Sequence, residues 1–292
     1  MIPEYTKDYE DNNRQTMLEK ILFPVRNINA KRLKERVENK TILITGASYG
    51  IGAALASILA EYTVTLLLVA RTEEKLAVLK KSIADKACTV KIYVADLRDE
   101  KEISNLLELW KNENIKIDIL INNAGKSIYR KLWNSLDRFH DTQRSAATNY
   151  TGPVQLLLGI LNGLVQKEAQ IINVSAINVL LPPAVGWSAY QSSKIAFDQW
   201  LRCSEAELKA ENISVSSIYL PLVRTRMSMV NENKHGQPAM SKEKAAKLIT
   251  NFIVKRKRKY APWWLGVVRL SAFIFPGMLY RIQLRQIKKA GR

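Results

Sequence analysis

Cysteine and histidine are scarce in this chain, and their positions exclude several classes of site. The cysteines are Cys88 and Cys203 and the histidines are His140 and His235, each far from the next. No disulfide framework is implied, so a reducing compartment is expected, and no cluster has the spacing of metal ligands. The opening stretch MIPEYTKDYEDNN is polar and acidic, which does not fit a secretory signal peptide.

Acidic residues are absent from Lys255 to Arg292, and cations are frequent there. The chain has a net charge of +18, and this stretch supplies most of the excess. Its cations are Lys255, Arg256, Lys257, Arg258, Lys259, Arg269, Arg281, Arg285, Lys288, Lys289 and Arg292. Such a cluster favours anionic lipid, a phosphorylated ligand or nucleic acid. Nucleic acid is not expected, because no base-reading motif or aromatic platform accompanies the cluster.

Apolar residues make up 47% of the chain and charged residues 25%, which is the composition of a folded globular protein. After residue 40, β-rich runs of strand length alternate with helix-length segments. The runs are 41–45, 63–70, 89–95, 117–123, 170–175 and 214–220. The helix-length segments include 50–60, 72–86 and 99–112. Apolar strands separated by helices predict an α/β fold, a single doubly wound Rossmann domain with a parallel sheet.

Helical extensions are expected on both sides of this domain. We place the N-terminal extension at 1–40, the Rossmann domain at 41–254 and the basic, apolar C-terminal extension at 255–292. One short amphipathic helix is predicted in the first extension, which Pro24 could kink, from the spacing of Leu18, Ile21, Leu22 and Val25.

A glycine-rich turn, TGASYGIG at 45–52, follows the first predicted strand and opens the first predicted helix. Gly46 permits the tight turn, and Gly50 and Gly52 let the backbone approach a pyrophosphate at the helix N-terminus. The same letters contain G-x-S-x-G, the nucleophile elbow of serine hydrolases, with Ser48 as nucleophile and His235 as partner. That alternative is weak, because only some forty mostly polar residues precede the turn, too few for the strands an elbow requires.

Two charged residues follow the second and third predicted strands. Arg71 stands where NAD-preferring folds of this kind carry an acid, so its guanidinium could hold the 2′-phosphate of NADP(H). It could also be an exposed arginine at the start of a helix. Asp96 could accept a hydrogen bond from the adenine amino group or could cap the next helix.

Tyr190 and Lys194 are four residues apart, so on a helix they share one face. An ammonium near a phenol favours phenolate and lowers a pKa that is about 10 when unperturbed. Tyr190 would then be a proton donor to a reduced carbonyl oxygen. The spacing alone is common, but TGASYGIG, NNAG at 122–125 and Asn149 in NYTG accompany it in order.

With these motifs the chain resembles the short-chain dehydrogenase/reductase family over roughly residues 40–255. The resemblance implies that Tyr190 is the general acid, that Lys194 lowers its pKa and binds the nicotinamide ribose, and that Asn149 holds a water. It further implies that Asn122 supports the adenine-ribose side and that Thr225 touches the carboxamide. The implied NADPH-binding residues are Gly46, Ser48, Tyr49, Gly50, Ile51, Gly52, Arg71, Asp96, Leu97, Asn123, Ala124, Gly125, Tyr190, Lys194, Val223 and Thr225. Relatives of this kind are usually homodimers or homotetramers.

One position departs from the family pattern. Family members usually carry two serines after the strand, the second of them catalytic, and here that second position is Ala176. Ser175 precedes it, and alternation along a strand would point it to the wrong face. An irregular backbone beyond the strand could swing Ser175 into place. We favour Ser175 as the fourth catalytic residue; the alternative is a structural serine in a slow enzyme.

A narrower resemblance concerns the substrate. The stretches GKSIYRKL (125–132), DRFHD (137–141), SIYLPLVRTRM (217–227) and MSKEKAAKLI (240–249) resemble the short-chain-type fatty acyl-CoA reductases. That branch uses NADPH to convert a long-chain thioester to a fatty aldehyde. A reductase of 3-oxoacyl or steroid-like ketones and a non-catalytic, membrane-docked nucleotide-binding protein remain alternatives.

The apolar stretch 261–280 has the length of a membrane span but contains Arg269 and Pro276. These residues favour a segment on a membrane surface or over a pocket, and a core or dimer-packing helix is the alternative. A cytoplasmic protein with a possible peripheral contact to an anionic membrane is therefore expected.

Overall fold

The computed structural model describes residues 16–27, 29–164, 168–229 and 237–290. Within them, seven strands form one parallel sheet in the order β3-β2-β1-β4-β5-β6-β9. The strands are β1 (Thr41–Thr45), β2 (Thr65–Ala70), β3 (Thr89–Val94), β4 (Ile119–Asn122), β5 (Gln170–Ala176), β6 (Ser214–Leu220) and β9 (Lys259–Tyr260). The predicted doubly wound α/β fold and its six strands are confirmed. The seventh strand, β9, is two residues long and lies in a basic run that carries no strand signal.

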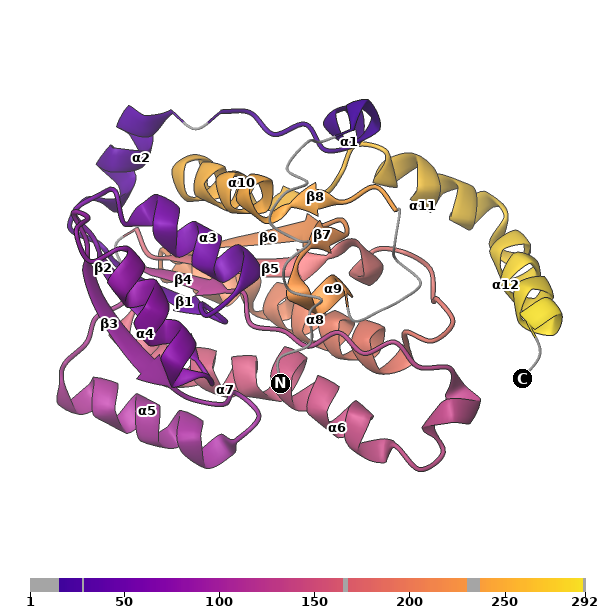
Figure 1. Ribbon diagram of the computed structural model, residues 1–292, viewed down its shortest axis with the longest axis horizontal. Coiled ribbons are helices and arrows are strands. Elements are labelled where there is room, and N and C mark those ends of the chain that lie inside the picture. Colours follow the sequence, from indigo (N-terminus) through magenta and orange to yellow (C-terminus); the bar gives the residue numbers. More distant parts are fainter. Residues whose placement is uncertain (1–15, 28, 165–167, 230–236, 291–292) are drawn as a thin grey trace.

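Helices cover both faces of the sheet (Figure 1). One face carries α2 (Ala30–Val37), α3 (Gly50–Leu59), α4 (Glu73–Ser82) and α10 (Lys242–Lys255). The other carries α5 (Glu100–Asn112), α7 (Gly152–Ile160) and α8 (Ser188–Ala210). α6 (Phe139–Ala146) packs against α8. The two faces explain the continuous apolar strands, since both sides of each strand are buried.

The alternation of side chains along β1 illustrates this two-sided burial. Ile42 and Ile44 belong to the core under α3 and α10, whereas Leu43 belongs to the core under α5, α7 and α8. All three side chains are fully buried. Side chains at odd and even positions of a strand therefore face different sets of helices.

The chain between the strands contains several short elements near the carboxyl ends of the sheet. These are η2 (Leu132–Ser135), the π-helical turn η3 (Ala147–Thr151), η5 (Ile177–Val179), β7 (Val223–Arg224), α9 (Arg226–Met229) and β8 (Met240–Ser241). β7 and β8 pair with each other outside the main sheet. In open α/β sheets ligands bind at this edge, so these elements surround the expected site. The remaining short element, η4 (Leu161–Gly163), lies at the opposite edge, where the carbonyl of Gly163 accepts a hydrogen bond from the backbone N–H of Ile117 before β4.

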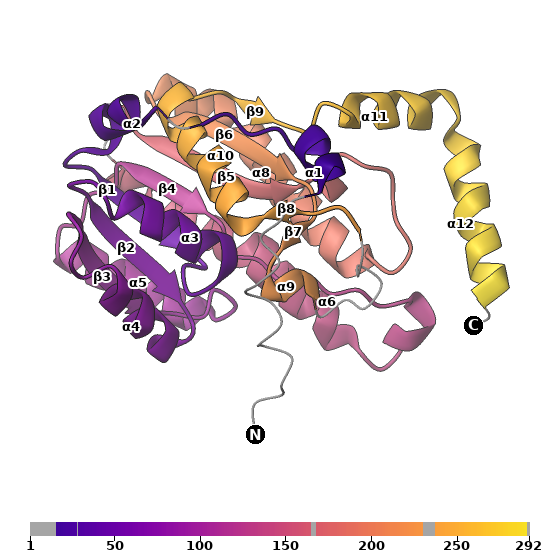
Figure 2. The same cartoon turned by 45° about the horizontal axis from the view of Figure 1, so that its top comes forward.

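The N-terminal extension crosses the outside of α10 (Figure 2). Its helix α1 (Met17–Leu22) ends before Pro24, so the predicted kink is wrong and Val25 lies beyond the helix. Phe23 is buried and belongs to the same hydrophobic cluster as side chains of α3 and α10. The predicted boundaries at residues 40 and 254 stay a prediction.

The C-terminal extension forms α11 (Leu265–Ile274) and α12 (Pro276–Ala290), which lie away from the sheet (Figure 2). Among the described residues, no single helix has both the length and the apolar composition of a membrane span. Residues 265–274 and 276–289 meet both criteria together but are bent by 95°. The bend lies at Pro276, which cannot donate the hydrogen bond that would continue α11.

Candidate active site

The glycine turn between β1 and α3 is closed by contacts that leave no room for side chains. Gly46 and Gly50 have φ angles of +65° and +57°, a region that favours glycine. A Cβ on Gly46 would lie 2.8 Å from the Cα of Ala124, and one on Gly52 would lie 2.4 Å from the carbonyl oxygen of Gly46. The turn therefore presents bare backbone at the N-terminus of α3, which suits a pyrophosphate.

A hydrogen-bond network fixes the NNAG stretch to this turn. The backbone N–H groups of Asn123 and Ala124 donate to Oγ1 of Thr45, each at 3.0 Å. The Asn123 side-chain amide donates to the carbonyl oxygens of Thr45 and Gly46 at 3.0 and 3.2 Å. Asn123 is thus a positioning residue whose amide is directed at the protein backbone. Sequence reasoning missed Thr45, because a threonine before a glycine carries no distinctive signal.

The loop that contains Thr225 meets the glycine turn. A Cβ on Gly50 would lie 3.1 Å from Cγ2 of Thr225. The guanidinium of Arg226 lies over the Tyr49 ring, 5.2 Å from its centroid. Val223 is buried in β7 directly before this loop. The loop that is expected to touch the carboxamide therefore already contacts the turn that is expected to hold the pyrophosphate.

A cluster of cations surrounds Asp96 after β3. Arg98 donates through Nε to both carboxylate oxygens of Asp96, and Arg71 lies 3.7 Å from the same carboxylate. Burial alone raises the pKa of Asp96, but the bonds from Arg98 outweigh it and hold the pKa below its ordinary value. Asp99, not Asp96, is the N-cap of α5, so the alternative of a helix cap is wrong.

More positive charge lies beside this cluster than is balanced by the carboxylates of Asp96 and of Glu102, which accepts from the backbone N–H of Asp96 at 2.7 Å. Burial, followed by the neighbouring Arg144, Arg71 and Arg98, lowers the pKa of Lys126. Sequence reasoning missed Arg98 and Lys126. The signal that could have found them is their position, because each directly follows a recognised motif, ADL or NNAG. Such a local excess of positive charge favours an anionic ligand.

Tyr190 and Lys194 lie on the same face of α8, as their spacing predicts. Lys194 is 7% exposed; its Nζ donates to the carbonyl oxygen of Val174 at 3.5 Å and lies close to Gly125. Burial lowers the pKa of Lys194 to about 8, and Asp198 on the next turn partly opposes that shift. Burial raises the pKa of Tyr190 to about 12, so the expected lowering by Lys194 is not seen. The desolvated Tyr190 phenol keeps its proton at neutral pH.

Ser175 occupies the face of β5 that α8 covers. It shares that face with Ile171, which packs in the core beneath α8, whereas Ala176 alternates to the opposite face. β5 keeps its register with β6 through Ser175 and Ala176, so the expected irregular backbone is wrong. The expectation that regular alternation would point Ser175 to the wrong face is also wrong, because alternation itself places Ser175 on the side of α8. Ser175 is 4% exposed and its Oγ has no hydrogen-bond partner within the described part of the protein. A buried hydroxyl without a partner is a group that a ligand oxygen can satisfy.

Asn149 lies in the π-helical turn η3 between α6 and α7. Its side chain is 1% exposed and holds both backbone groups of Lys126: Oδ1 accepts from the N–H at 2.8 Å, and Nδ2 donates to the carbonyl at 2.8 Å. Nδ2 also donates to Oγ of Ser193, the neighbour of Lys194. π-helical turns are rare in proteins overall, and those that occur are often found at functional sites. The water that Asn149 is expected to hold stays a prediction.

A row of aromatic rings leads to the tyrosine. The rings of Tyr129 and Trp187 are 5.1 Å apart, and those of Trp187 and Tyr190 are 5.7 Å apart. Gly186 allows this packing, because a Cβ there would lie 2.3 Å from the Tyr129 ring. Its carbonyl accepts a hydrogen bond from the backbone N–H of Arg130 at 2.8 Å. The row places aromatic side chains directly beside the Tyr190 ring.

Sequence reasoning also missed a contact by which the N-terminal helix α1 holds the segments around Arg224 and Ala239. Glu19 in α1 is 2% exposed and accepts hydrogen bonds from the Arg224 side chain and from the backbone N–H of Ala239 at 3.0 Å. Burial raises its pKa, but the bonds from Ala239 and Thr16 and the charge of Arg224 together hold it below its ordinary value. Arg224 directly precedes Thr225. No local pattern links residues that are more than two hundred positions apart.

The structure thus brings together the glycine turn, the NNAG stretch, Thr225 and Lys194. Tyr190 shares the face of α8 with Lys194, and Ser175 lies on the face of β5 that α8 covers. Arg71 and Asp96 lie at the ends of the neighbouring strands β2 and β3, beside the glycine turn. Leu97 is buried there, and a Cβ on Gly152 in α7 would lie 1.9 Å from its carbonyl oxygen. His235, which the hydrolase alternative requires, lies outside the described residues.

Comparison with known proteins gives consistent matches. A family model described as short chain dehydrogenase matches residues 40–236. The chain is 43% identical over 229 residues to a fatty acyl-CoA reductase of Acinetobacter baylyi, covering 78% of this chain and 77% of that protein. A fatty acyl-CoA reductase of Mycobacterium tuberculosis is 34% identical over 224 residues, covering 76% of each chain.

Solved structures share the fold. A dehydrogenase/reductase from Sinorhizobium meliloti superposes with a TM-score of 0.69 at 21% identity, covering 79% of this chain and 94% of that one. A metagenomic short-chain oxidoreductase in complex with NADP has a TM-score of 0.62 at 22% identity, covering 75% of this chain and 92% of that one.

Proposed function

This chain belongs to the short-chain dehydrogenase family, and from that premise we propose that it is an NADPH-dependent reductase of long-chain fatty acyl-CoA thioesters that releases a fatty aldehyde. The family establishes an oxidoreductase that uses a nicotinamide cofactor, so the serine-hydrolase alternative is wrong. The observation that carries the chemistry is the group formed by Tyr190, Lys194 and the partnerless Ser175 hydroxyl. The substrate class is supported by the identity to the Acinetobacter baylyi reductase.

The residues present fit a dinucleotide. The glycine turn offers backbone N–H groups at the start of α3, and a Cβ on Gly46 or Gly52 would collide with that backbone. Arg71 and Arg98, with Lys126 nearby, supply positive charge that suits the 2′-phosphate of NADPH rather than the free hydroxyl of NADH. When bound, the nicotinamide supplies the hydride.

In the proposed reaction the thioester carbonyl carbon gains the hydride and Tyr190 gives its proton to the carbonyl oxygen. The pKa of Tyr190, which burial raises to about 12, keeps the phenol protonated and ready to donate at neutral pH. Ser175 donates its hydroxyl hydrogen to the same oxygen and orients it. The resulting hemithioacetal breaks its carbon–sulfur bond, and the products are an aldehyde and the free thiol of coenzyme A.

Lys194 and Asn149 serve Tyr190 in this scheme. The pKa of Lys194, which burial lowers to about 8, leaves the side chain mostly an ammonium at pH 7 and close to the point at which it can pass a proton. Asn149 holds the Lys126 backbone and Ser193, which fixes the loop after NNAG against α8. Both residues therefore act on the geometry and the proton supply of the tyrosine.

Incubation of the protein with NADPH and palmitoyl-CoA tests the proposal. Aldehyde and free thiol formed in equal amounts are the expected products, and Tyr190→Phe should form neither while still binding NADPH. Reduction of ketones alone would assign the chain to a 3-oxoacyl or steroid-like carbonyl reductase. Cofactor binding without turnover of any carbonyl would favour a non-catalytic nucleotide-binding protein, an alternative that Ala176 motivates.

The surroundings of the enzyme are part of the proposal. We place it in the cytoplasm, as a homodimer or homotetramer, in peripheral contact with an anionic membrane through the cationic stretch 255–292. Light scattering of the purified full chain measures the oligomeric state, and a monomer would contradict that part of the proposal.

A further inference from the structure

We propose that α11, α12 and residues 132–139 form one docking face for an anionic lipid bilayer, and that the acyl chain enters the site from the lipid between them. This inference rests on the proposed long-chain substrate. Membrane contact through the tail alone would anchor the protein at any orientation. Two separate patches, both connected to the segments around Tyr190, would fix the orientation and direct that side of the molecule at the bilayer.

The first patch lies on the C-terminal helices. Most of their large apolar side chains are exposed, and Phe273 is 83% exposed. The patch includes Val267, Leu270, Phe273, Ile274, Phe275 and Met278. Monomeric soluble domains rarely leave so many adjacent apolar side chains in water. Helix α1 extends the patch, because Trp263 before α11 donates to the carbonyl of Ile21, and Ile21 is itself exposed.

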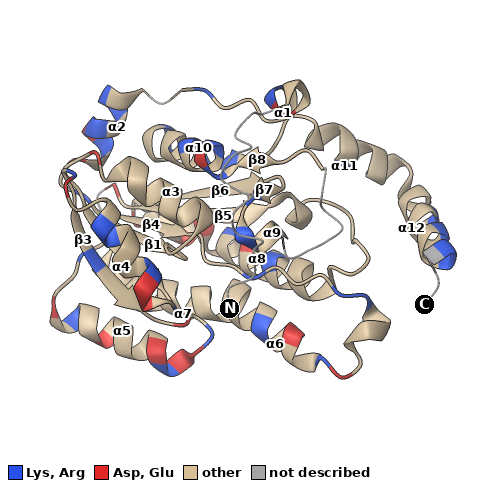
Figure 3. Cartoon of the chain, viewed as in Figure 1, with Lys and Arg blue, Asp and Glu red and all other residues tan. Residues whose placement is uncertain are grey.

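Charge selects the kind of partner for this patch. Cations lie among and beyond the apolar side chains, and Figure 3 shows no acidic residue on α11 or α12. These cations are Arg269, Arg281, Arg285, Lys288 and Lys289, all exposed. An apolar patch with only cations around it fits the boundary between acyl chains and anionic headgroups. A second copy of this chain fits poorly, because a two-fold interface would bring the same cations together.

The bend of 95° between residues 265–274 and 276–289 determines the depth of the contact. A span would require one straight apolar helix, and the bent pair carries charged residues on both arms. Such helices can lie in the interface with their apolar side chains in the outer acyl region. The bound state is therefore peripheral.

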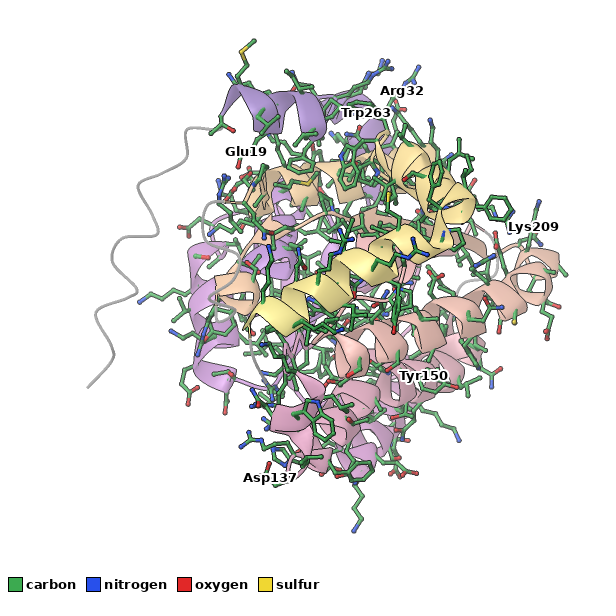
Figure 4. All side chains as sticks on the ribbon, turned by 90° about the vertical axis from the view of Figure 1, so that its right-hand side faces the viewer. Glu19, Arg32, Asp137, Tyr150, Lys209 and Trp263 are labelled. Carbon is green, nitrogen blue, oxygen red and sulfur yellow. The ribbon has the colours of Figure 1, made fainter. Side chains whose placement is uncertain are left out.

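The second patch lies on η2 and the start of α6. It consists of Leu132, Trp133, Leu136 and Phe139, each between 61% and 75% exposed. Lys131 flanks it, as do Arg130 and Arg138, which both pair with the Asp141 carboxylate, and Asp137 is an exposed acid within it. Figure 4 looks onto this side of the molecule and shows α12 crossing the view with Asp137 below it, so the two patches border the same side.

Both patches are connected to the catalytic tyrosine. Gln283 of α12 accepts a hydrogen bond from the N–H of Val185 at 3.2 Å and donates to the carbonyl of Pro183 at 3.0 Å, in the loop that leads to Tyr190. The second patch follows Tyr129, the first ring of the aromatic row that ends at Tyr190. An acyl chain between the patches would reach that row without crossing water.

Flotation of the full chain with vesicles tests the face. The wild-type protein should float with vesicles of phosphatidylcholine mixed with phosphatidylserine, less with phosphatidylcholine alone, and less at high salt. Phe273→Asp and Leu136→Asp should each reduce flotation at least tenfold. Val78→Asp, at a position that is 64% exposed on α4, is the matched control and should float as the wild type does.

Kinetics separates this inference from the proposed function. Phe273→Asp and Leu136→Asp should lose turnover of palmitoyl-CoA presented on anionic vesicles and retain turnover of soluble butyryl-CoA. If the wild-type protein turns over palmitoyl-CoA but does not float with vesicles at low salt, the docking face is refuted and the proposed reductase function is not. Flotation without turnover of any thioester would leave the face and refute the reductase. If the wild-type protein does not bind vesicles and forms a dimer that Phe273→Asp dissociates, the face is an interface between two copies of the chain. That result would overturn the inference.

Discussion

Replacing Lys194 by methionine should stabilise the protein in the absence of cofactor, although it removes a residue of the proposed active site. The pKa of Lys194 falls from its ordinary 10.5 to about 8, because the amine is buried. Each unit is equivalent to about 1.36 kcal/mol, so the ionised amine costs the folded state roughly 3 kcal/mol. Methionine has nearly the same length and no charge, so it removes this cost while filling the space.

The pH dependence of this effect follows from the direction of the shift. The folded pKa of Lys194 lies below the unfolded one, so the cost is fully present below pH 8, shrinks between pH 8 and 10.5, and vanishes above. Denaturant unfolding of both proteins at pH 7, 8.5 and 10 measures it. Lys194→Met should exceed the wild type by roughly 3 kcal/mol at pH 7, and this advantage should decrease with rising pH.

A matched control isolates the buried amine from lysine in general. Lys209 lies on the same helix but is exposed (Figure 4), so Lys209→Met should change the free energy of unfolding by less than about 0.5 kcal/mol at each pH. A less stable Lys194→Met protein at pH 7, or an advantage that does not change with pH, would refute the reasoning.

Three further predictions concern the other parts of the site. Ser175→Ala should lower kcat about 10²- to 10³-fold and leave the Kd for NADPH unchanged, and unchanged turnover would assign Ser175 a structural role. Arg71→Asp should weaken NADPH binding about ten- to a hundredfold more than NADH binding, measured by fluorescence titration, whereas equal effects would contradict a contact with the 2′-phosphate. Glu19→Ala should lower the free energy of unfolding by about 2 kcal/mol in denaturant melts, a figure reduced from that of a buried pair because Arg224 is a third exposed. A free energy of unfolding that is unchanged within error would show that the hydrogen bond from Arg224 to Glu19 does not hold the helix in place.

The parts of the fold and site that the sequence predicted correctly depend on local pattern. Apolar runs of strand length placed six parallel strands, and the spacing of Tyr190 and Lys194 placed both side chains on one face of α8. The glycine turn was identifiable because only glycine tolerates a backbone contact such as that between Gly46 and Ala124.

What the sequence did not predict depends on distant contacts. The pKa of Tyr190 is raised because burial outweighs the neighbouring amine, and burial is a property of the assembled fold. The side on which Ser175 lies depends on how far β5 stays in register with β6. The contact of Glu19 with Arg224 joins segments that share no pattern. Each of these three features depends on how whole helices and strands pack against each other, which the sequence pattern does not show.

The π-helical turn at Ala147–Thr151 makes the site sensitive to chain length at one point. Such a turn holds one residue more than a regular helical turn, and each residue of an α-helix rotates the following side chains by about 100°. Deleting a single residue here would let α6 run smoothly into α7 and would cost the fold little. The Asn149 amide would then turn away from Lys126 and Ser193. A relative shortened by one residue here would therefore keep the fold and the cofactor site but lose catalytic activity.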